Sequence, residues 1–365
     1  MTAGQGIGTA LMLLFLADVF LTVLYARAGT GLLAPRWNRI VWALLRGLAK
    51  LAGRHRSTAL SFAGPLIVVS LIAFWSFGLT LGVALIVQPE LGIAIRPSSG
   101  EAPTDFVTAL LVAGNSLSIV GGGDYSPHTT GTRFLFLLNS LIGASVLSLV
   151  LSYLVQVYSG LRERNALALT VDWMTDGTGD AAVLLHRLMP RGEAGDATNE
   201  LSSLARSLAA IKEAHHFYPL LFYFRFEEPR YAVSRLSFVL LDATTLIECA
   251  LDRKHYATVA ASAPVASIRR GTLMLLETLD SHFPTATGHS EDAEIGLRLR
   301  QSYVAAERTL AGAGIAVRTD GVDAYVAGRE KWEPLVGRVA PILGYTMAEI
   351  DRRTSNMTDL LAGPK

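Results

Sequence analysis

Three long apolar stretches occupy the first half of the chain, at residues 7–25, 62–87 and 134–158. A helix needs about 20 apolar residues to cross a bilayer, and each stretch reaches that length. Beyond residue 160, apolar positions recur at helical spacing among charged residues, near 161–174, 198–226, 230–258, 265–282, 291–312 and 346–361. The pattern predicts an all-α membrane protein with three transmembrane helices and an α-helical domain outside the membrane.

The density and sign of charged residues also change near residue 160. Residues 1–160 hold nine Lys or Arg and five Asp or Glu, a net charge of +4, whereas residues 161–365 hold 23 and 26, a net charge of −3. Neither half has the strongly basic surface that nucleic-acid binding requires, so we expect no nucleic-acid partner. The single cysteine, Cys249, excludes an intrachain disulfide, and no Cys/His spacing indicates zinc or another cofactor.

The connection between the first two stretches is strongly basic. Between Asp18 and Glu90 there is no acidic residue, while residues 27–56 carry seven Lys or Arg. Cytoplasmic loops carry such an excess, so we expect the N-terminus outside and the C-terminal domain in the cytoplasm, beneath a plasma (inner) membrane. No basic residue precedes the first stretch, which favours an uncleaved span over a signal peptide. Within the span, Asp18 is expected to pair with a cation near the inner face.

Residues 37–51 in this connection are too short and too charged to span a bilayer. Their tryptophans and basic residues predict a helix lying among the headgroups of membrane lipids. A voltage sensor is the alternative, but the cations do not form a sustained repeat and only one span precedes them.

The outer connection contains a short apolar helix between two spans. Thr104 is a candidate N-cap for a helix that begins at Asp105 and runs to about Leu117. At 1.5 Å per residue such a helix is about 20 Å long, too short to cross the membrane. We therefore predict a re-entrant pore helix, followed by a filter strand composed of Ser118, Ile119, Val120, Gly121, Gly122, Gly123 and Asp124.

The glycines of this strand suggest how it binds ions. Irregular backbone at membrane depth is costly unless it lines protein or water. Glycine tolerates positive φ, so successive carbonyls can turn toward one axis and replace the hydration shell of a cation. We predict K⁺ or Na⁺ at the backbone carbonyls of Val120, Gly121 and Gly122, with Asp124 concentrating cations at the outer mouth.

Residues 62–158 resemble the potassium-channel superfamily in its outer helix, pore loop and inner helix form. The resemblance rests on the strand from Val120 to Asp124, on Gly143 nineteen residues after Asp124, where the family often has a hinge glycine, and on supporting positions Pro127, Thr129, Gly131 and Arg133. It implies a homotetramer around a central pore, because each chain supplies only one filter strand.

The filter also departs from the family sequence Thr-Val-Gly-Tyr-Gly-Asp. The threonine falls on Ile119, the tyrosine falls on Gly122, and an acidic residue that some members carry on the pore helix falls on Asn115. These changes remove a hydroxyl ligand from the filter and side chains that would support the strand from behind. The sequence therefore fits two interpretations, a potassium channel and a weakly selective monovalent cation channel. The alternative is a non-conducting receptor or scaffold that retains the pore fold.

The third span contains the candidate gate. Leu147, Leu151 and Val155 share one helix face and could form a hydrophobic constriction in a four-fold bundle; lipid-facing or interhelical packing is the alternative. Gly143 is either a hinge or a position of close helix packing, because Ala144 and Ser145 are also small.

We predict three regions: residues 1–60 hold the first transmembrane helix and the interfacial helix, 61–160 the pore module, and 161–365 the helical cytoplasmic domain. The sequence of the helical cytoplasmic domain has no Gly-rich phosphate turn and no arrangement of side chains that predicts an enzyme. It does not identify a cytoplasmic ligand or protein partner, and either is compatible with it.

Two polar clusters in this domain are candidate metal-binding sites. Asp172, Asp176 and Asp180 do not follow the EF-hand order, so a solvated helix end is favoured over a calcium site. His215 and His216 are adjacent rather than four apart, which favours helix packing over metal ligation.

Overall fold

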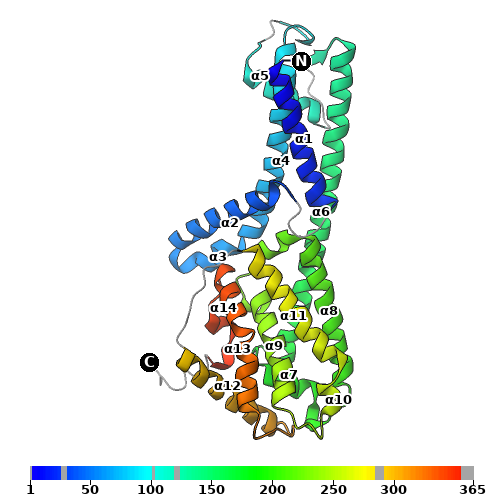
Figure 1. Ribbon diagram of the computed structural model, residues 1–365. Helices are drawn as coiled ribbons and strands as arrows, with labels where there is room; N and C mark the ends of the chain where they lie inside the picture. The colour runs from blue at the N-terminus through cyan, green and yellow to red at the C-terminus, as the bar shows by residue number, and fades with distance from the viewer. Residues whose placement is uncertain (1, 26–30, 101–102, 119–123, 284–291, 355–365) are drawn as a thin grey trace. The chain divides into compact units, whose positions relative to one another are not determined.

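The computed structural model describes the chain except for residues 1, 26–30, 101–102, 119–123, 284–291 and 355–365 (Figure 1). The chain divides into two compact units. Unit 1 contains Met1–Gly47, Gly64–Tyr158 and Phe217–Leu220, and unit 2 contains Leu48–Ala63, Ser159–His216 and Leu221–Lys365.

Three helices are long and apolar enough to cross a membrane: α1 (Ala3–Val23), α4 (Ala63–Val87, followed by a 3₁₀ turn, Gln88–Glu90) and α6 (Thr130–Met174). This finding confirms the expected class of all-α membrane protein. Helix α6 continues sixteen residues past the end of the predicted third span at Tyr158, so it belongs to both units.

Unit 1 also contains α2 (Ala34–Leu51, whose last turn belongs to unit 2), α5 (Phe106–Leu117) and two short strands. Strands β1 (Ile95–Pro97) and β2 (Tyr125–Pro127) pair antiparallel, with Ile95 opposite Pro127. The sequence did not predict this two-stranded sheet, since three residues are too few for an alternating pattern.

Helices α1 and α4 approach closely because glycines face each other. A Cβ atom on Gly8 would lie 2.5 Å from the carbonyl oxygen of Gly82. Small residues at such contacts let two membrane helices pack backbone to backbone. Further along these helices, larger side chains form a buried cluster with α6, composed of Phe15, Val19, Ala34, Leu71, Trp75, Leu79 and Val150.

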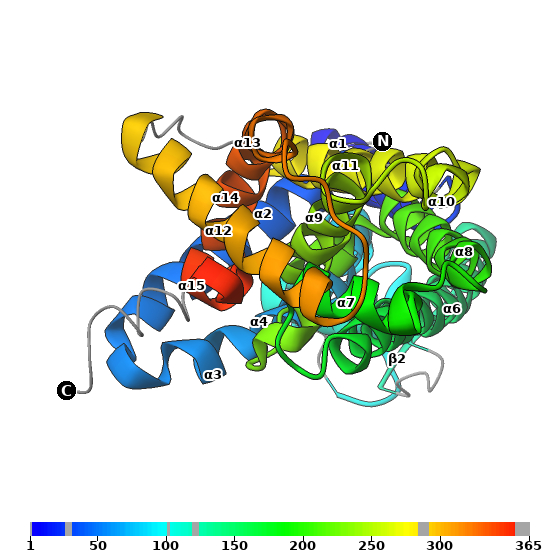
Figure 2. The same ribbon diagram turned by 90° about the horizontal axis from the view of Figure 1, so that it is seen from below.

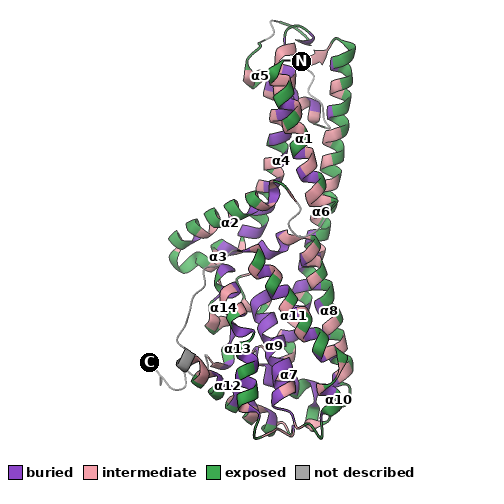
Figure 3. Cartoon of the chain, in the orientation of Figure 1, coloured by how far each residue is buried: buried purple, intermediate pink, exposed green. Residues whose placement is uncertain are grey.

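Unit 2 is helical. Its helices are α3 (Arg56–Ser61), α7 (Ala181–Leu188), α8 (Ala197–Phe217), α9 (Val233–Cys249), α10 (Ala257–Ala260), α11 (Ala263–His282), α12 (Asp292–Gly312), α13 (Val322–Glu330), α14 (Glu333–Ile342) and α15 (Met347–Ile350). Helix α9 lies at the centre and packs against α7, α11, α13 and α14 (Figure 2). It is buried along almost its whole length (Figure 3).

Helices α3, α7, α13 and α14 of unit 2 were not predicted. The expected helix over 198–226 is also too long, because α8 ends at Phe217 and a 3₁₀ turn, Pro219–Tyr223, follows. Proline disfavours helical backbone in the residue before it, so Pro219 explains this end. Thr346 and Glu349 form a capping box at the start of α15, with Thr346 Oγ1 accepting from the Glu349 amide at 3.3 Å.

The core of unit 2 contains a network of ion pairs. Arg329 on α13 is fully buried and pairs with Asp242 at 3.1 Å and with Asp351 at 3.0 Å. Arg353 pairs with the second carboxylate oxygen of Asp242 at 2.9 Å. Buried charges are tolerated when they are paired and hydrogen-bonded, and here the pairs tie the last described turn of the chain to α9 and α13.

Candidate functional site

Helix α5 is the short apolar helix that the sequence predicts between the second and third spans. Its N-cap is Asp105 rather than Thr104: Asp105 Oδ1 accepts hydrogen bonds from the backbone amides of Val107 at 2.9 Å and Thr108 at 3.0 Å. A carboxylate at this position satisfies amides that the helix leaves unpaired and interacts favourably with its dipole. With 12 residues, α5 is about 18 Å long and cannot cross a bilayer.

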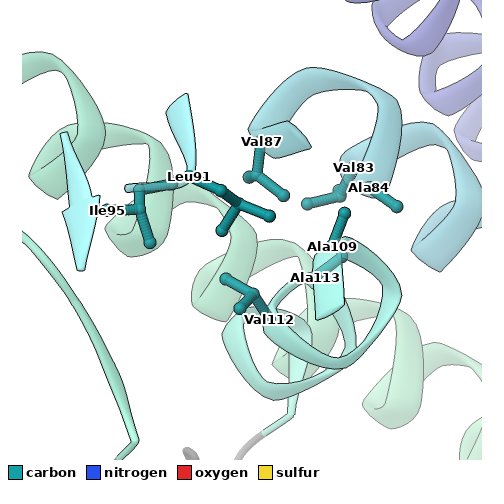
Figure 4. Close-up of a cluster of buried hydrophobic side chains, with 8 residues drawn as sticks. All are labelled: Val83, Ala84, Val87, Leu91, Ile95, Ala109, Val112 and Ala113. Atoms are coloured by element: carbon teal, nitrogen blue, oxygen red, sulfur yellow. The ribbon is translucent and has the colours of Figure 1, made fainter. Parts of the chain in front are cut away.

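One face of α5 packs against the end of α4. Figure 4 shows Ala109, Val112 and Ala113 of α5 turned toward Val83, Ala84 and Val87 of α4. Leu91, which follows the 3₁₀ turn after α4, and Ile95, the first residue of β1, complete this buried cluster. The two alanines keep the helices close, so α5 is held by apolar packing along its length.

The C-terminal end of α5 packs against the first third of α6. The Asn139 Nδ2 group donates to Ser116 Oγ at 3.0 Å, and both side chains are buried. One turn further along α6, a Cβ atom on Gly143 would lie 1.8 Å from the carbonyl oxygen of Leu117. Only glycine allows this approach, so the structure supports the packing role of Gly143. The Asn139–Ser116 contact was not predicted, because it joins residues 23 positions apart on two different helices.

Both ends of the predicted filter strand are anchored. The Ser118 amide donates to the Gly114 carbonyl at 2.9 Å and ends α5, while the Asp124 carbonyl accepts from the Ser98 amide at 2.8 Å beside the two-stranded sheet. The side chains of Ser118 and Asp124 are exposed in the single chain. Ile119, Val120, Gly121, Gly122 and Gly123 lie outside the described residues, so their predicted roles stay predictions.

The predicted gate face is exposed in the single chain. Leu147, Leu151 and Val155 have exposed fractions of 46%, 54% and 67%. In contrast, Val150 is 5% exposed and belongs to the cluster with α1 and α4. Helix α6 therefore has one face packed within its own chain and an apolar face with no cover in that chain. Such a face suits lipid, a neighbouring copy or a dewetting constriction.

The comparisons with known proteins match this part of the chain. A family model described as "Ion channel" matches residues 66–159, about a quarter of the sequence, from within α4 to just past the predicted third span. Residues 66–159 are thus similar to an ion-channel module. The match supports the resemblance to the potassium-channel superfamily.

A curated relative extends the similarity beyond the channel module. The chain is 20% identical over 248 residues to the uncharacterized membrane protein YdjJ of Bacillus subtilis, which covers 68% of this chain and 70% of that protein. No solved structure matches the chain significantly.

Asp18, next to the channel module on α1, has different partners from those expected. Its carboxylate accepts from the backbone amides of Leu33 at 2.7 Å and Ala34 at 3.1 Å, and from Trp75 Nε1 at 2.8 Å. The expectation of a pair with a cation was therefore wrong. The N-terminus of α2, with its unpaired amides and positive end of the helix dipole, takes the place of the cation.

Asp172, Asp176 and Asp180, which follow the channel module in the sequence, have separate partners. Asp172 pairs with Arg235 at 3.2 Å, Asp176 pairs with Arg187, and Asp180 caps α7 through the Ala182 amide at 2.8 Å. Within the described residues, no group of three acidic, His or Cys side chains could hold a metal ion.

His215 packs in the core of unit 2. Its side chain is fully buried, Nδ1 lies 2.8 Å from the Ile211 carbonyl oxygen, and its ring centroid lies 4.8 Å from that of Phe222. Burial, together with the nearby Arg164 guanidinium, lowers the pKa of His215 to about 3. The imidazole is therefore neutral near pH 7.

Proposed function

We propose that this protein is a gated channel for monovalent cations, assembled as a homotetramer, with unit 2 serving assembly or regulation in the cytoplasm. The observation that carries the proposal is the short α5, capped at one end and packed against α6 at the other, within residues that match an ion-channel family. Such a helix leaves an anchored strand between two spans, where backbone carbonyls can meet a permeating ion.

The orientation follows from charge. The basic connection at residues 27–56 belongs on the cytoplasmic side of a plasma (inner) membrane, which leaves Asp124 at the outer mouth and unit 2 inside. Exposed apolar side chains of α2, among them Ile40, Leu44 and Leu48, support contact of this helix with membrane lipids.

The selectivity argument comes from the filter sequence. Ile119 offers no hydroxyl ligand, and Gly122 offers no aromatic ring to brace the strand. A strand with three glycines can relax around the smaller Na⁺ ion. Each 1.4 kcal/mol lost from the binding free energy of K⁺ relative to Na⁺ lowers the preference for K⁺ about tenfold. We propose appreciable Na⁺ passage beside K⁺.

Flux through the purified full chain in liposomes tests the function. K⁺-driven or Na⁺-driven flux is expected from wild type, and bi-ionic reversal potentials should show weak discrimination between the two ions. The double variant Ile119→Thr with Gly122→Tyr should move the reversal potential toward K⁺. A strongly K⁺-selective wild type overturns the selectivity argument, and anion permeation overturns the carbonyl pore.

A non-conducting receptor or scaffold is the second candidate, favoured by the same altered filter residues. Absence of flux from correctly assembled tetramers would support it. Flux that Asp124→Asn reduces would favour the channel, because the outer carboxylates should concentrate cations.

A further inference from the structure

Unit 2 contains two buried arginines whose charge is not balanced by a carboxylate. In the part of the chain that the structure describes, the buried arginines are Arg164, Arg225, Arg235, Arg329 and Arg353. The last three each pair with at least one aspartate. Arg164 and Arg225, at 1% and 5% exposure, have no ion pair among the described residues.

Arg164 lies on α6, six residues past the predicted third span, and binds only backbone carbonyls. Its Nη1 and Nη2 groups donate to the carbonyl oxygens of Leu221 and Phe224, each at 3.0 Å. Its Nε group is buried and has no hydrogen-bond partner. Burial lowers the pKa of Arg164 to about 10, which reflects a charge that its neighbours do not neutralise.

Arg225 also binds only neutral groups. Its Nε donates to the Leu343 carbonyl at 3.1 Å, and Nη1 donates to the Ser57 carbonyl at 2.7 Å. Its Nη2 donates to Ser57 Oγ at 2.9 Å, and its guanidinium carbon lies 4.6 Å from the ring centroid of Tyr345.

Arg164 and Arg225 are among the residues that line one small cavity. The cavity has a volume of about 10 Å³, and the other residues around it are Phe222, Phe224, Val233, Leu279, Leu343 and Tyr345. That space holds one water-sized molecule. The wall contains two cations, aromatic rings and aliphatic side chains, and no carboxylate.

Removing a charged guanidinium from water costs free energy, and that cost is not recovered when no counter-ion lies beside it. A neutral water relieves little of this cost, whereas a single negative ion interacts favourably with both guanidiniums. Phosphate and carboxylate ligands are too large for the cavity. From the cavity, the unpartnered Nε group and the two unpaired cations, we propose a binding site for one small monatomic anion of the halide class, between Arg164 and Arg225.

The site joins four segments of unit 2. Ser57 lies on α3 shortly before α4 begins, Arg164 lies on the extension of α6, Arg225 follows the 3₁₀ turn after α8, and Leu343 follows α14. An anion bound here would hold together the segments that lead into both helices of the channel module. The site is thus suited to sense the cytoplasmic halide concentration.

Thermal unfolding of the full chain in detergent tests the binding without requiring ion flux. Chloride is exchanged for gluconate at constant Na⁺ and constant ionic strength. In wild type we expect the unfolding temperature to rise with chloride and to saturate, as ligand linkage requires. Arg225→Gln should lose the saturable rise. Arg338→Gln should keep it, because Arg338 has its own carboxylate partner, Asp280, at 2.9 Å.

Bromide provides a measurement that needs no variant. Crystals of the full chain soaked in bromide should show an anomalous peak in the cavity between Arg164 and Arg225. A cavity without anomalous signal, or an equal chloride response in wild type and Arg225→Gln, would mean that water alone fills the site and would overturn the proposal. The unfolding temperature and the anomalous peak can both be measured whether or not the protein conducts ions in liposomes. Failure of the anion site can therefore be distinguished from failure of the proposed cation channel.

Discussion

At the scale of single residues, the contact between α5 and α6 depends on side-chain size. Gly143 allows the Leu117 carbonyl to touch α6, and Asn139 and Ser116 form a buried hydrogen bond one turn away. The side-chain Oδ1 of Asn139 is buried and has no hydrogen-bond partner among the described residues. Ser116 and Leu117 come just before the predicted filter strand in the sequence, so we expect small changes at this contact to affect the channel module.

Gly143→Ala tests the packing role. The added methyl group would lie 1.8 Å from the Leu117 carbonyl oxygen, so α5 or α6 must shift at a cost of about 1–3 kcal/mol. Gly131→Ala is the matched control, since nothing lies within 4 Å of its Cβ position on the same helix. We expect a lower unfolding temperature in detergent for Gly143→Ala and an unchanged or higher one for Gly131→Ala. Equal stability of the two variants, with altered gating in the first, would favour the hinge.

His215 should make the stability of unit 2 depend on pH. Its pKa is about 3 in the folded chain against an ordinary value of 6.5, so only the unfolded chain takes up its proton between these values. Folding stability is therefore highest above pH 6.5 and falls as the pH is lowered toward 3. We expect His215→Gln to reduce this loss when thermal unfolding is compared at pH 7.5 and 5. The exposed His186, changed to Gln, is the control; the same pH slope in wild type and both variants would contradict the expectation.

At the scale of elements, Asp18 connects three helices of unit 1. Its carboxylate on α1 caps the start of α2 and accepts from Trp75 on α4. Helix α2 is thereby fixed to α1 and α4 by one buried side chain. Trp37 of α2 adds a stacked contact with Phe74, with ring centroids 4.3 Å apart.

Asp18→Ala should loosen the start of α2. Loss of a helix cap costs about 0.5–2 kcal/mol of stability. A change of 1.4 kcal/mol shifts the equilibrium for local opening of the helix about tenfold. The Leu33 and Ala34 amides should therefore exchange with solvent about tenfold faster. Asp18→Asn keeps an acceptor oxygen and should show a smaller change. Hydrogen exchange measured by mass spectrometry on peptides covering these residues is the test, and unaltered exchange in Asp18→Ala would show that the cap is dispensable.

Long apolar elements were predictable from the sequence, and side-chain contacts were not. The second span was expected at 62–87, and α4 is Ala63–Val87, because lipid imposes a simple requirement of length and apolarity. In unit 2, α13 has only nine residues with a weakly periodic pattern, and tertiary packing against α9 and α12 decides its formation. The Asn139–Ser116 bond and the unpaired charges of Arg164 and Arg225 depend on distant segments meeting, which no local spacing encodes.

At the scale of the whole molecule, α6 joins the two units as one continuous helix. Its residues up to Tyr158 belong to unit 1 and those from Ser159 belong to unit 2. The predicted gate residues Leu147, Leu151 and Val155 lie on the part of α6 that belongs to unit 1, and Arg164 lies on the part that belongs to unit 2.

The exposed face of α6 should lie at an interface between copies of the chain. One pore loop supplies one strand, so four copies are needed to surround an ion, and native mass spectrometry should give four times 39.2 kDa, about 157 kDa. Cysteine cross-linking then distinguishes the faces. Leu151 is 54% exposed and Val150 is 5% exposed, although they are neighbours on the helix.

Leu151→Cys should therefore form disulfide-linked dimers on oxidation, whereas Val150→Cys should not, because its side chain packs against α1 and α4 of its own chain. A disulfide requires Cβ atoms about 3.5–4.5 Å apart, so the bond reports a close approach of equivalent helices. The native Cys249 is buried and should give no background. A monomeric mass, or equal cross-linking at both positions, would contradict the tetramer with this face inward, and the proposed gate would then have to be abandoned.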